Sequence, residues 1–191
     1  MRVRRALARA YWRVSRWSPD PTKPPQEGRG ILLGAPHTSN WDFVLMLALA
    51  WHWGVSVRWL GKQSLFKRPF GPLMRALGGI PVQRDNPGHL VEDMVEQLSS
   101  GGPTYLVITP EGSRSAQPYW KSGFYRIARA TGFTVTLGYV DRRTMTAGLG
   151  PTLTMTGDVR ADMDRVRAFY AGKVGVRPGE ERIPRLHAEE E

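Results

Sequence analysis

The sequence predicts an α/β fold: a single domain with a largely parallel central sheet flanked by helices, preceded by a basic amphipathic helix. Two observations predict it. Short apolar segments typical of buried strands alternate along the chain with longer segments of helical periodicity. The chain has 191 residues, of which 41% are hydrophobic, enough for one domain with its own core. The absence of Cys excludes disulfides, Cys-zinc sites and thiol catalysis.

Residues 1–17 predict the amphipathic helix. Its apolar side chains recur at helical spacing, and six Arg occupy the other faces; the apolar positions are Val3, Leu7, Tyr11, Val14 and Trp17. This pattern is typical of a helix lying in a membrane interface. The same side chains would also suit packing on the chain's own domain, so two interpretations stay open. Residues 18–29 are Pro-rich and predict a linker.

Residues 30–172 hold the alternating strands and helices of the predicted main domain. Strands are expected at 31–34, 55–60, 80–83, 104–109, 134–140 and 153–156, and helices at 40–53, 68–77, 89–98, 122–130 and 163–170. Ser39 or Asn40 suits the N-cap of the first of these helices, and Asp42 its first turn. Residues 173–191 are polar and are expected to form a loose C-terminal tail.

The positive charge is confined to the first half of the chain. The formal net charge is +10; residues 1–84 hold 14 Lys and Arg against three Asp and Glu, a net of +11, and residues 85–191 contribute −1. A basic surface attracts nucleic acid, anionic lipid or phosphorylated substrates. The longest apolar run, residues 43–51, is far below the ~20 residues of a membrane span. The N-terminus lacks a signal-peptide pattern, so we expect a cytoplasmic protein.

Two loops that follow predicted strands carry chemically capable residues. In the first, His37 leaves a strand end and Asp42 lies in the first turn of the next helix, so the two side chains can meet. A carboxylate beside one imidazole nitrogen fixes the tautomer and makes the other nitrogen a general base for a hydroxyl. No G-x-S-x-G motif accompanies the pair, which favours direct attack by a substrate hydroxyl. A turn histidine and a helix-dipole carboxylate would show the same spacing.

The second loop has residues suited to an anionic ligand. Arg114 can clamp a phosphate bidentately, Ser113 can donate a hydroxyl, and Gly112 permits close backbone approach. Glu111 can orient Arg114 or bond a substrate hydroxyl. Arg84, at the end of another short strand, places a further charge on the same side of the sheet.

Taken in order, these segments resemble the glycerolphosphate and lysophosphatidate acyltransferases, in the form of a short bacterial-type member. Residues 37–42, His-Thr-Ser-Asn-Trp-Asp, resemble the HxxxxD motif of that family, residues 80–84 its IPVxR block, and residues 110–115 its PEGTRS block with Ser113 in place of Thr. Residues 62–66 and 120–123 resemble two further stretches of the family, the first of which supplies Lys62. The resemblance runs from about residue 30 to 140 and departs from the family pattern at Pro36, where Asn is usual.

The resemblance implies transfer of a fatty acyl group from acyl-CoA or acyl-carrier protein to a hydroxyl of a phosphorylated lipid acceptor in phospholipid biosynthesis. It implies catalytic roles for His37 and Asp42. The implied substrate-binding residues are Lys62, Arg84, Glu111, Gly112, Ser113 and Arg114. No metal and no tightly bound cofactor is implied. The expected location is the inner face of the membrane, held peripherally through residues 1–17, and no nucleic-acid partner is expected.

Three alternatives stay open. The first keeps the chemistry but uses a glycolipid or another alcohol as acceptor. The second is a peripheral membrane protein with an inactive acyltransferase core. The third is a non-catalytic nucleic-acid binder, suggested by the charge of +10 and the seven Trp; it predicts a steep salt dependence of binding.

Overall fold

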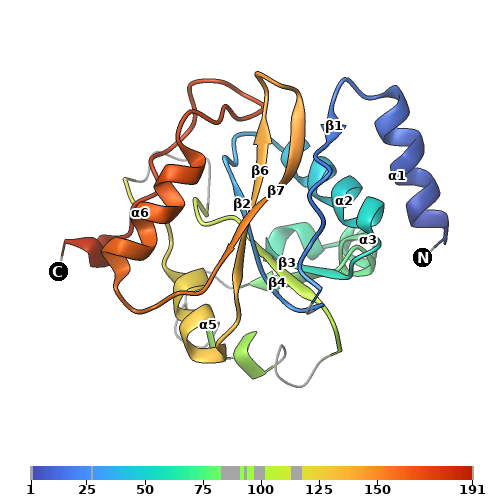
Figure 1. Cartoon of the computed structure of the whole chain (residues 1–191). Helices are drawn as coiled ribbons and strands as arrows, with labels where there is room; N and C mark the ends of the chain where they lie inside the picture. Colours follow the sequence, from blue (N-terminus) through green and yellow to red (C-terminus); the bar gives the residue numbers. More distant parts are fainter. Residues whose placement is uncertain are drawn as a thin grey trace.

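The computed structural model describes residues 2–26, 28–82, 91–92, 94–96, 102–112 and 118–190. Within them, seven strands form one sheet in the order β1-β7-β6-β2-β5-β3-β4 (Figure 1). The strands are β1 (Ser18–Pro19), β2 (Gly30–Ala35), β3 (Val57–Lys62), β4 (Gly79–Val82), β5 (Tyr105–Ile108), β6 (Val135–Asp141) and β7 (Thr146–Leu153). Neighbours are parallel except β6 and β7. The predicted α/β fold with a largely parallel sheet is confirmed.

Helices cover both faces of this sheet (Figure 1). The helices α1 (Arg2–Val14), α2 (Trp41–Trp53) and α3 (Gly71–Ala76) lie on one side, and α5 (Gly123–Thr131) and α6 (Val159–Tyr170) on the other. The described residues also include two short 3₁₀ helices, η1 (Gln63–Phe66) and η2 (His187–Glu189). A sheet covered on both faces must bury the side chains of both faces, which is why its central strands are continuously apolar.

Successive side chains of the central strands enter hydrophobic clusters on opposite faces of the sheet. In β2, Ile31 and Leu33 are fully buried and pack in the same cluster as residues of α5 and α6. The intervening Leu32 points to the other face, where it packs against the cluster of Trp59, Phe66 and Val107. This period-2 alternation fixes the register of β2 in the middle of the sheet.

The strand predicted at residues 153–156 is misplaced. In the structure β7 ends at Leu153 and runs antiparallel to β6, with Asp141 opposite Thr146. The segment was missed because Gly148, Gly150 and Pro151 are poor strand formers, which favour loops when they are judged by composition alone.

The two ends of the chain are more ordered than expected. The first residues of the predicted linker join the sheet as β1, where the Ser18 N–H donates to the Met145 carbonyl at 2.8 Å. The expected loose tail after residue 172 instead packs on the domain: Leu186 is 1% exposed and lies in the main core cluster. A single buried apolar residue such as Leu186 produces no hydrophobic periodicity, so its packing could not be predicted from the sequence.

The helix expected at 89–98 lies partly outside the described residues; residues 91–92 and 94–96 of it are helical. None of the helices in the described part of the chain is both long and apolar enough to cross a membrane.

Candidate active site

The turn from β2 into α2 brings His37 and Asp42 together. The parallel strands β2, β3, β4 and β5 end at one edge of the sheet, where ligand sites of such folds lie. There His37 Nδ1 lies 3.2 Å from Asp42 Oδ2, within ion-pair distance. The geometry of this contact does not meet that of a hydrogen bond. His37 is 24% exposed and Asp42 9%, which leaves the imidazole accessible from outside.

Asp42 is also the centre of the turn that carries the pair. Its Oδ2 accepts the backbone N–H of Thr38 at 2.8 Å and that of Ser39 at 2.7 Å. Thr38 and Ser39 are buried, so these N–H groups need acceptors within the protein. Asn40 precedes the helix without a side-chain cap bond. Ser39, the other expected N-cap, does accept a first-turn N–H, that of Trp41, through its Oγ, and the Asp42 carboxylate fixes the preceding loop to the first turn of α2.

The backbone at the start of α2 has little capacity left for an oxyanion. Besides Thr38 and Ser39, the N–H of Trp41 donates to Ser39 Oγ at 3.2 Å, and that of Asp42 donates to the Ser39 carbonyl at 3.2 Å. Backbone N–H groups at the start of a helix can stabilise a developing negative charge when they are unpartnered. In this structure these donors already have partners.

Glu111 reaches the same site from the loop after β5. It is 2% exposed, and its Oε1 accepts the backbone N–H of His37 at 3.0 Å. Burial raises the pKa of this carboxyl, while the His37 N–H bond and the nearby charge of Arg182 act in the opposite direction. Glu111 thus holds the main chain of His37 in place, a contact that sequence reasoning did not anticipate.

Gly112 permits a close approach, but by another part of the protein. It has φ +67°, a left-handed conformation that favours glycine, and a Cβ there would lie 3.1 Å from Lys121 Cγ. The Lys121 N–H donates to the Pro110 carbonyl at 2.7 Å. The backbone of the 110–112 turn is therefore held against Lys121.

Of the remaining predicted binding residues, only Lys62 lies in the described part of the chain. Lys62 ends β3 at the same sheet edge and is exposed. Arg84, Ser113 and Arg114 lie outside the described residues. Among those that are described, no group of three or more His, Asp or Glu side chains is placed to hold a metal ion.

One comparison with known proteins decides the family. A family model described as Acyltransferase matches residues 20–138, more than half of the chain, and this range contains His37, Asp42 and Glu111. The chain belongs to the acyltransferase family. Searches of curated proteins and of solved structures found no match.

A segment beyond the matched range also contacts the candidate site. The N–H of Arg177 donates to Thr38 Oγ1 at 2.9 Å, and Gly175 lies directly against the Thr38 side chain. Glu181 secures this segment, accepting the N–H of Gly175 at 2.8 Å and that of Gly179 at 2.7 Å. No periodicity or motif marks these residues in the sequence, so only the folded chain reveals them.

Tyr170, near the end of α6, supports the strands beneath the site. Its hydroxyl lies 2.9 Å from the Leu33 carbonyl and 2.8 Å from the Gly138 carbonyl. Complete burial raises its pKa well above the ordinary value, and the negative charge of Glu111 raises it further. The neutral hydroxyl is therefore maintained as a hydrogen-bond donor between β2 and β6.

Proposed function

We propose that this protein is an O-acyltransferase that moves a fatty acyl group from acyl-CoA or acyl-carrier protein to a lysophosphatidate-type acceptor in phospholipid biosynthesis. The observation that carries the proposal is the His37–Asp42 contact of 3.2 Å in a chain of the acyltransferase family. It supports general-base activation of a hydroxyl at the carboxyl edge of the sheet. The resemblance of residues 37–42, 80–84 and 110–115 to the glycerolphosphate and lysophosphatidate enzymes supports the choice of acceptor.

In the proposed mechanism, His37 Nε2 takes the proton of the acceptor hydroxyl as its oxygen attacks the thioester carbon. The new ester C–O bond forms, the C–S bond breaks, and the departing thiolate receives the proton. Asp42 orients the ring through Nδ1 and stabilises the imidazolium that forms during attack. The chemistry needs neither a metal nor a tightly bound cofactor, because the thioester is already an activated acyl group.

The proposed acceptor site is basic. Arg84 and Arg114 would hold the acceptor phosphate, with Lys62 at the end of β3 adding positive charge, because planar guanidinium groups match the geometry of phosphate oxygens. Ser113 and Gly112 would complete this site. We assign Glu111 to holding the His37 backbone, because its described bond goes to that N–H.

We also propose that α1 binds an anionic membrane surface, on the inner face of the cytoplasmic membrane. Two apolar side chains of its predicted stripe, Tyr11 and Trp17, pack on the domain, whereas Val3, Leu7 and Val14 are 72%, 53% and 84% exposed. The Arg side chains at positions 2, 9, 13 and 16 are exposed on the same helix or just after it. Such an apolar flank beside cationic side chains favours insertion at a lipid headgroup boundary.

The central test is acyl transfer by purified His37→Ala protein, with His187→Ala as the matched control. A mass-spectrometric screen would cross acyl-CoA and acyl-carrier-protein donors with lysophosphatidate, lysophospholipid and glycolipid acceptors. We expect His37→Ala to lose nearly all transfer, about 10²-fold or more, and His187→Ala to retain it. Full activity of His37→Ala would refute the mechanism. Transfer confined to a glycolipid would keep the mechanism and replace the acceptor.

A further inference from the structure

The excursion of the chain between β3 and β4, which contains η1 and α3, exposes large apolar side chains to solvent. We define the η1–α3 surface as Leu65, Phe70 and Leu73 together with the cations Lys62, Lys67 and Arg68. Leu65 is 47% exposed, Phe70 65% and Leu73 53%. Three large apolar side chains within nine residues form a patch, unlike an isolated surface leucine.

The exposure of these side chains follows from how firmly the excursion is anchored. Phe66 is 7% exposed and stacks on the ring of Trp59 at 5.8 Å between centroids. The Trp59 indole N–H donates to the Leu77 carbonyl at 3.0 Å, and Gly71 packs against the Phe66 backbone, leaving no room for a side chain there. With Phe66 and Gly71 held inward, the neighbouring Phe70 is directed outward.

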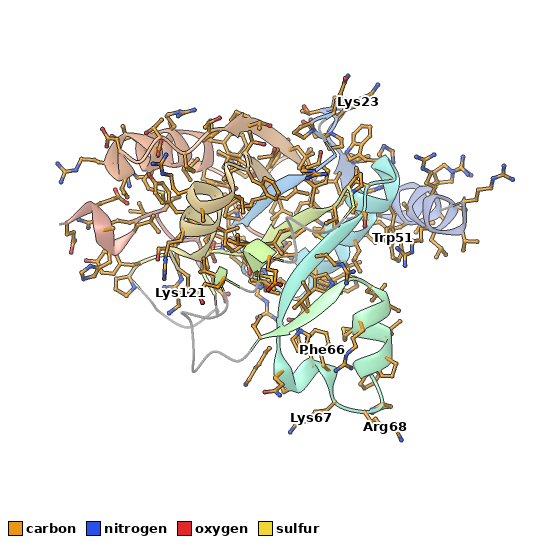
Figure 2. All side chains as sticks on the ribbon, turned by 90° about the horizontal axis from the view of Figure 1, so that it is seen from below. Lys23, Trp51, Phe66, Lys67, Arg68 and Lys121 are labelled. Atoms are coloured by element: carbon orange, nitrogen blue, oxygen red, sulfur yellow. The ribbon has the colours of Figure 1, made fainter. Side chains whose placement is uncertain are left out.

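The charge of the surface is of one sign. No acidic residue occurs between Asp42 and Val82. Lys67 and Arg68 extend from the outer end of the excursion, away from the sheet, whereas Phe66 turns inward (Figure 2). Apolar side chains surrounded by cations complement an anionic bilayer, because the apolar groups enter the acyl boundary while the cations meet lipid phosphates.

The end of α3 that follows the η1–α3 surface lies beside α1. Arg4 on α1 donates to the Ala76 carbonyl at the end of α3 at 3.1 Å. Arg4 also lines a polar cavity of about 210 Å³ with Arg58 and Arg75 at the amino end of β3. Val3 and Leu7 are four residues apart and share a face of α1, and Leu7 is three residues from Arg4, so this apolar face borders the side of α1 that contacts α3. The exposed apolar side chains of α1 and those of the η1–α3 surface can therefore contact the same bilayer, with arginines between them.

The position of η1 connects this surface with the active site. η1 directly follows β3, whose carboxyl end lies at the sheet edge that carries His37. A bilayer against Leu65 and Phe70 would therefore lie near the proposed acceptor site, to which Lys62 at the end of β3 belongs. We propose that the η1–α3 surface is a second lipid-docking surface that acts with α1 to orient the site toward the membrane. This inference rests on the proposed function in naming a lipid acceptor and in taking α1 as the first membrane contact.

The test compares vesicle binding of Phe70→Ser/Leu73→Ser with that of Ile183→Ser. Ile183 is the matched control, because it is 75% exposed but lies in the C-terminal segment. The vesicles contain phosphatidylcholine and phosphatidylglycerol in equal parts, and binding is measured by flotation. We expect the double variant to lower the partition coefficient at least about tenfold, and Ile183→Ser to change it less than about twofold. An equal effect of the two variants would overturn the proposal.

Three further experiments test whether the surface binds a bilayer together with α1 and whether another partner occupies it instead. Leu7→Ser combined with the double variant should lower partitioning by the product of the separate effects, as expected for independent contacts. Light scattering without vesicles should give the same mass for wild type and double variant; a dimer lost in the variant would assign the surface to a second copy. A loss of turnover confined to acyl-carrier-protein donors, with vesicle binding intact, would assign it to that acidic partner.

The proposed catalytic function can be tested independently of the docking surface. The double variant should turn over short-chain, water-soluble substrates at the wild-type rate, since neither side chain belongs to the His37 site. Failure of His37→Ala to lose activity would refute the catalytic mechanism and leave the flotation result standing. Unchanged unfolding midpoints of the exposed-site variants would show that lost binding is not lost folding.

Discussion

Asp42 has two tasks that substitution can separate. Its Oδ2 lies 3.2 Å from His37 Nδ1 and accepts the N–H groups of Thr38 and Ser39. Asp42→Asn retains a carbonyl oxygen for the N–H groups but removes the charge opposite the imidazole. Asp42→Ala removes both. The Asn variant should therefore lose activity while keeping stability, and the Ala variant should lose both.

The magnitudes follow from the geometry. A charge-assisted hydrogen bond contributes about 1.5–3 kcal/mol, and a Coulomb contact of 3.2 Å at an effective dielectric of about 20 sets an upper limit near 5 kcal/mol. In Asp42→Asn, kcat/KM should fall between about tenfold and several thousandfold. In Asp42→Ala, two buried N–H groups lose their acceptor at about 1–3 kcal/mol each, so the free energy of unfolding should fall by about 2–6 kcal/mol.

The assay exploits the absence of Cys in this chain. Release of the CoA thiol from palmitoyl-CoA in the presence of lysophosphatidate can be followed with a thiol reagent that finds no thiol on the enzyme. The free energy of unfolding is measured by urea titration with Trp fluorescence. A wild-type kcat/KM in Asp42→Asn would refute the electrostatic role. Equal stability of Asp42→Asn and Asp42→Ala would refute the structural one.

Two further predictions concern the groups that hold the His37 loop. Burial raises the pKa of Glu111 above its ordinary 4.5, so from that pH up to the folded pKa the unfolded chain binds fewer protons and the free energy of unfolding falls as pH rises. Glu111→Gln should lack this fall in urea titrations across pH; superimposable profiles would contradict the raised pKa. A Cβ at Gly175 would lie 2.5 Å from Thr38 Oγ1, so Gly175→Ala should lower the unfolding free energy by about 1–3 kcal/mol and reduce acyl transfer. Gly123→Ala, where a Cβ meets open space, is its control, and equal losses in both would exclude the contact as the cause.

Patterns among residues close in sequence were sufficient to predict the strands at the centre of the sheet. Apolar runs in β2 and β5 mark strands buried on both faces, because helices cover both sides of the sheet and the side chains of both faces must be buried. The spacing of His37 and Asp42 across a strand-to-helix turn allowed their side chains to meet, and the resemblance of residues 37–42 to the HxxxxD motif made that contact the expectation. Both inferences concern residues close in sequence, where backbone geometry leaves few arrangements.

Contacts between distant residues were beyond such rules. Glu111 lies 74 positions from His37 and Arg177 lies 139 from Thr38, and no local pattern encodes which N–H each oxygen accepts. The antiparallel course of β7 was missed for a related reason, since the pairing with β6 stabilises a Gly- and Pro-containing strand that its own composition disfavours.

The sequence by itself determined the alternation of strands and helices, the family motifs and the confinement of positive charge to the first half of the chain. The periodicity of residues 1–17 left two interpretations of the first helix, and the tertiary structure shows which part of its stripe packs on the domain. Tyr11 and Trp17 pack on the domain, whereas Val3, Leu7 and Val14 stay exposed. Periodicity reports only which side chains share a face. Which part of that face is covered depends on where α2 and β7 lie, and that is decided by the packing of the whole chain.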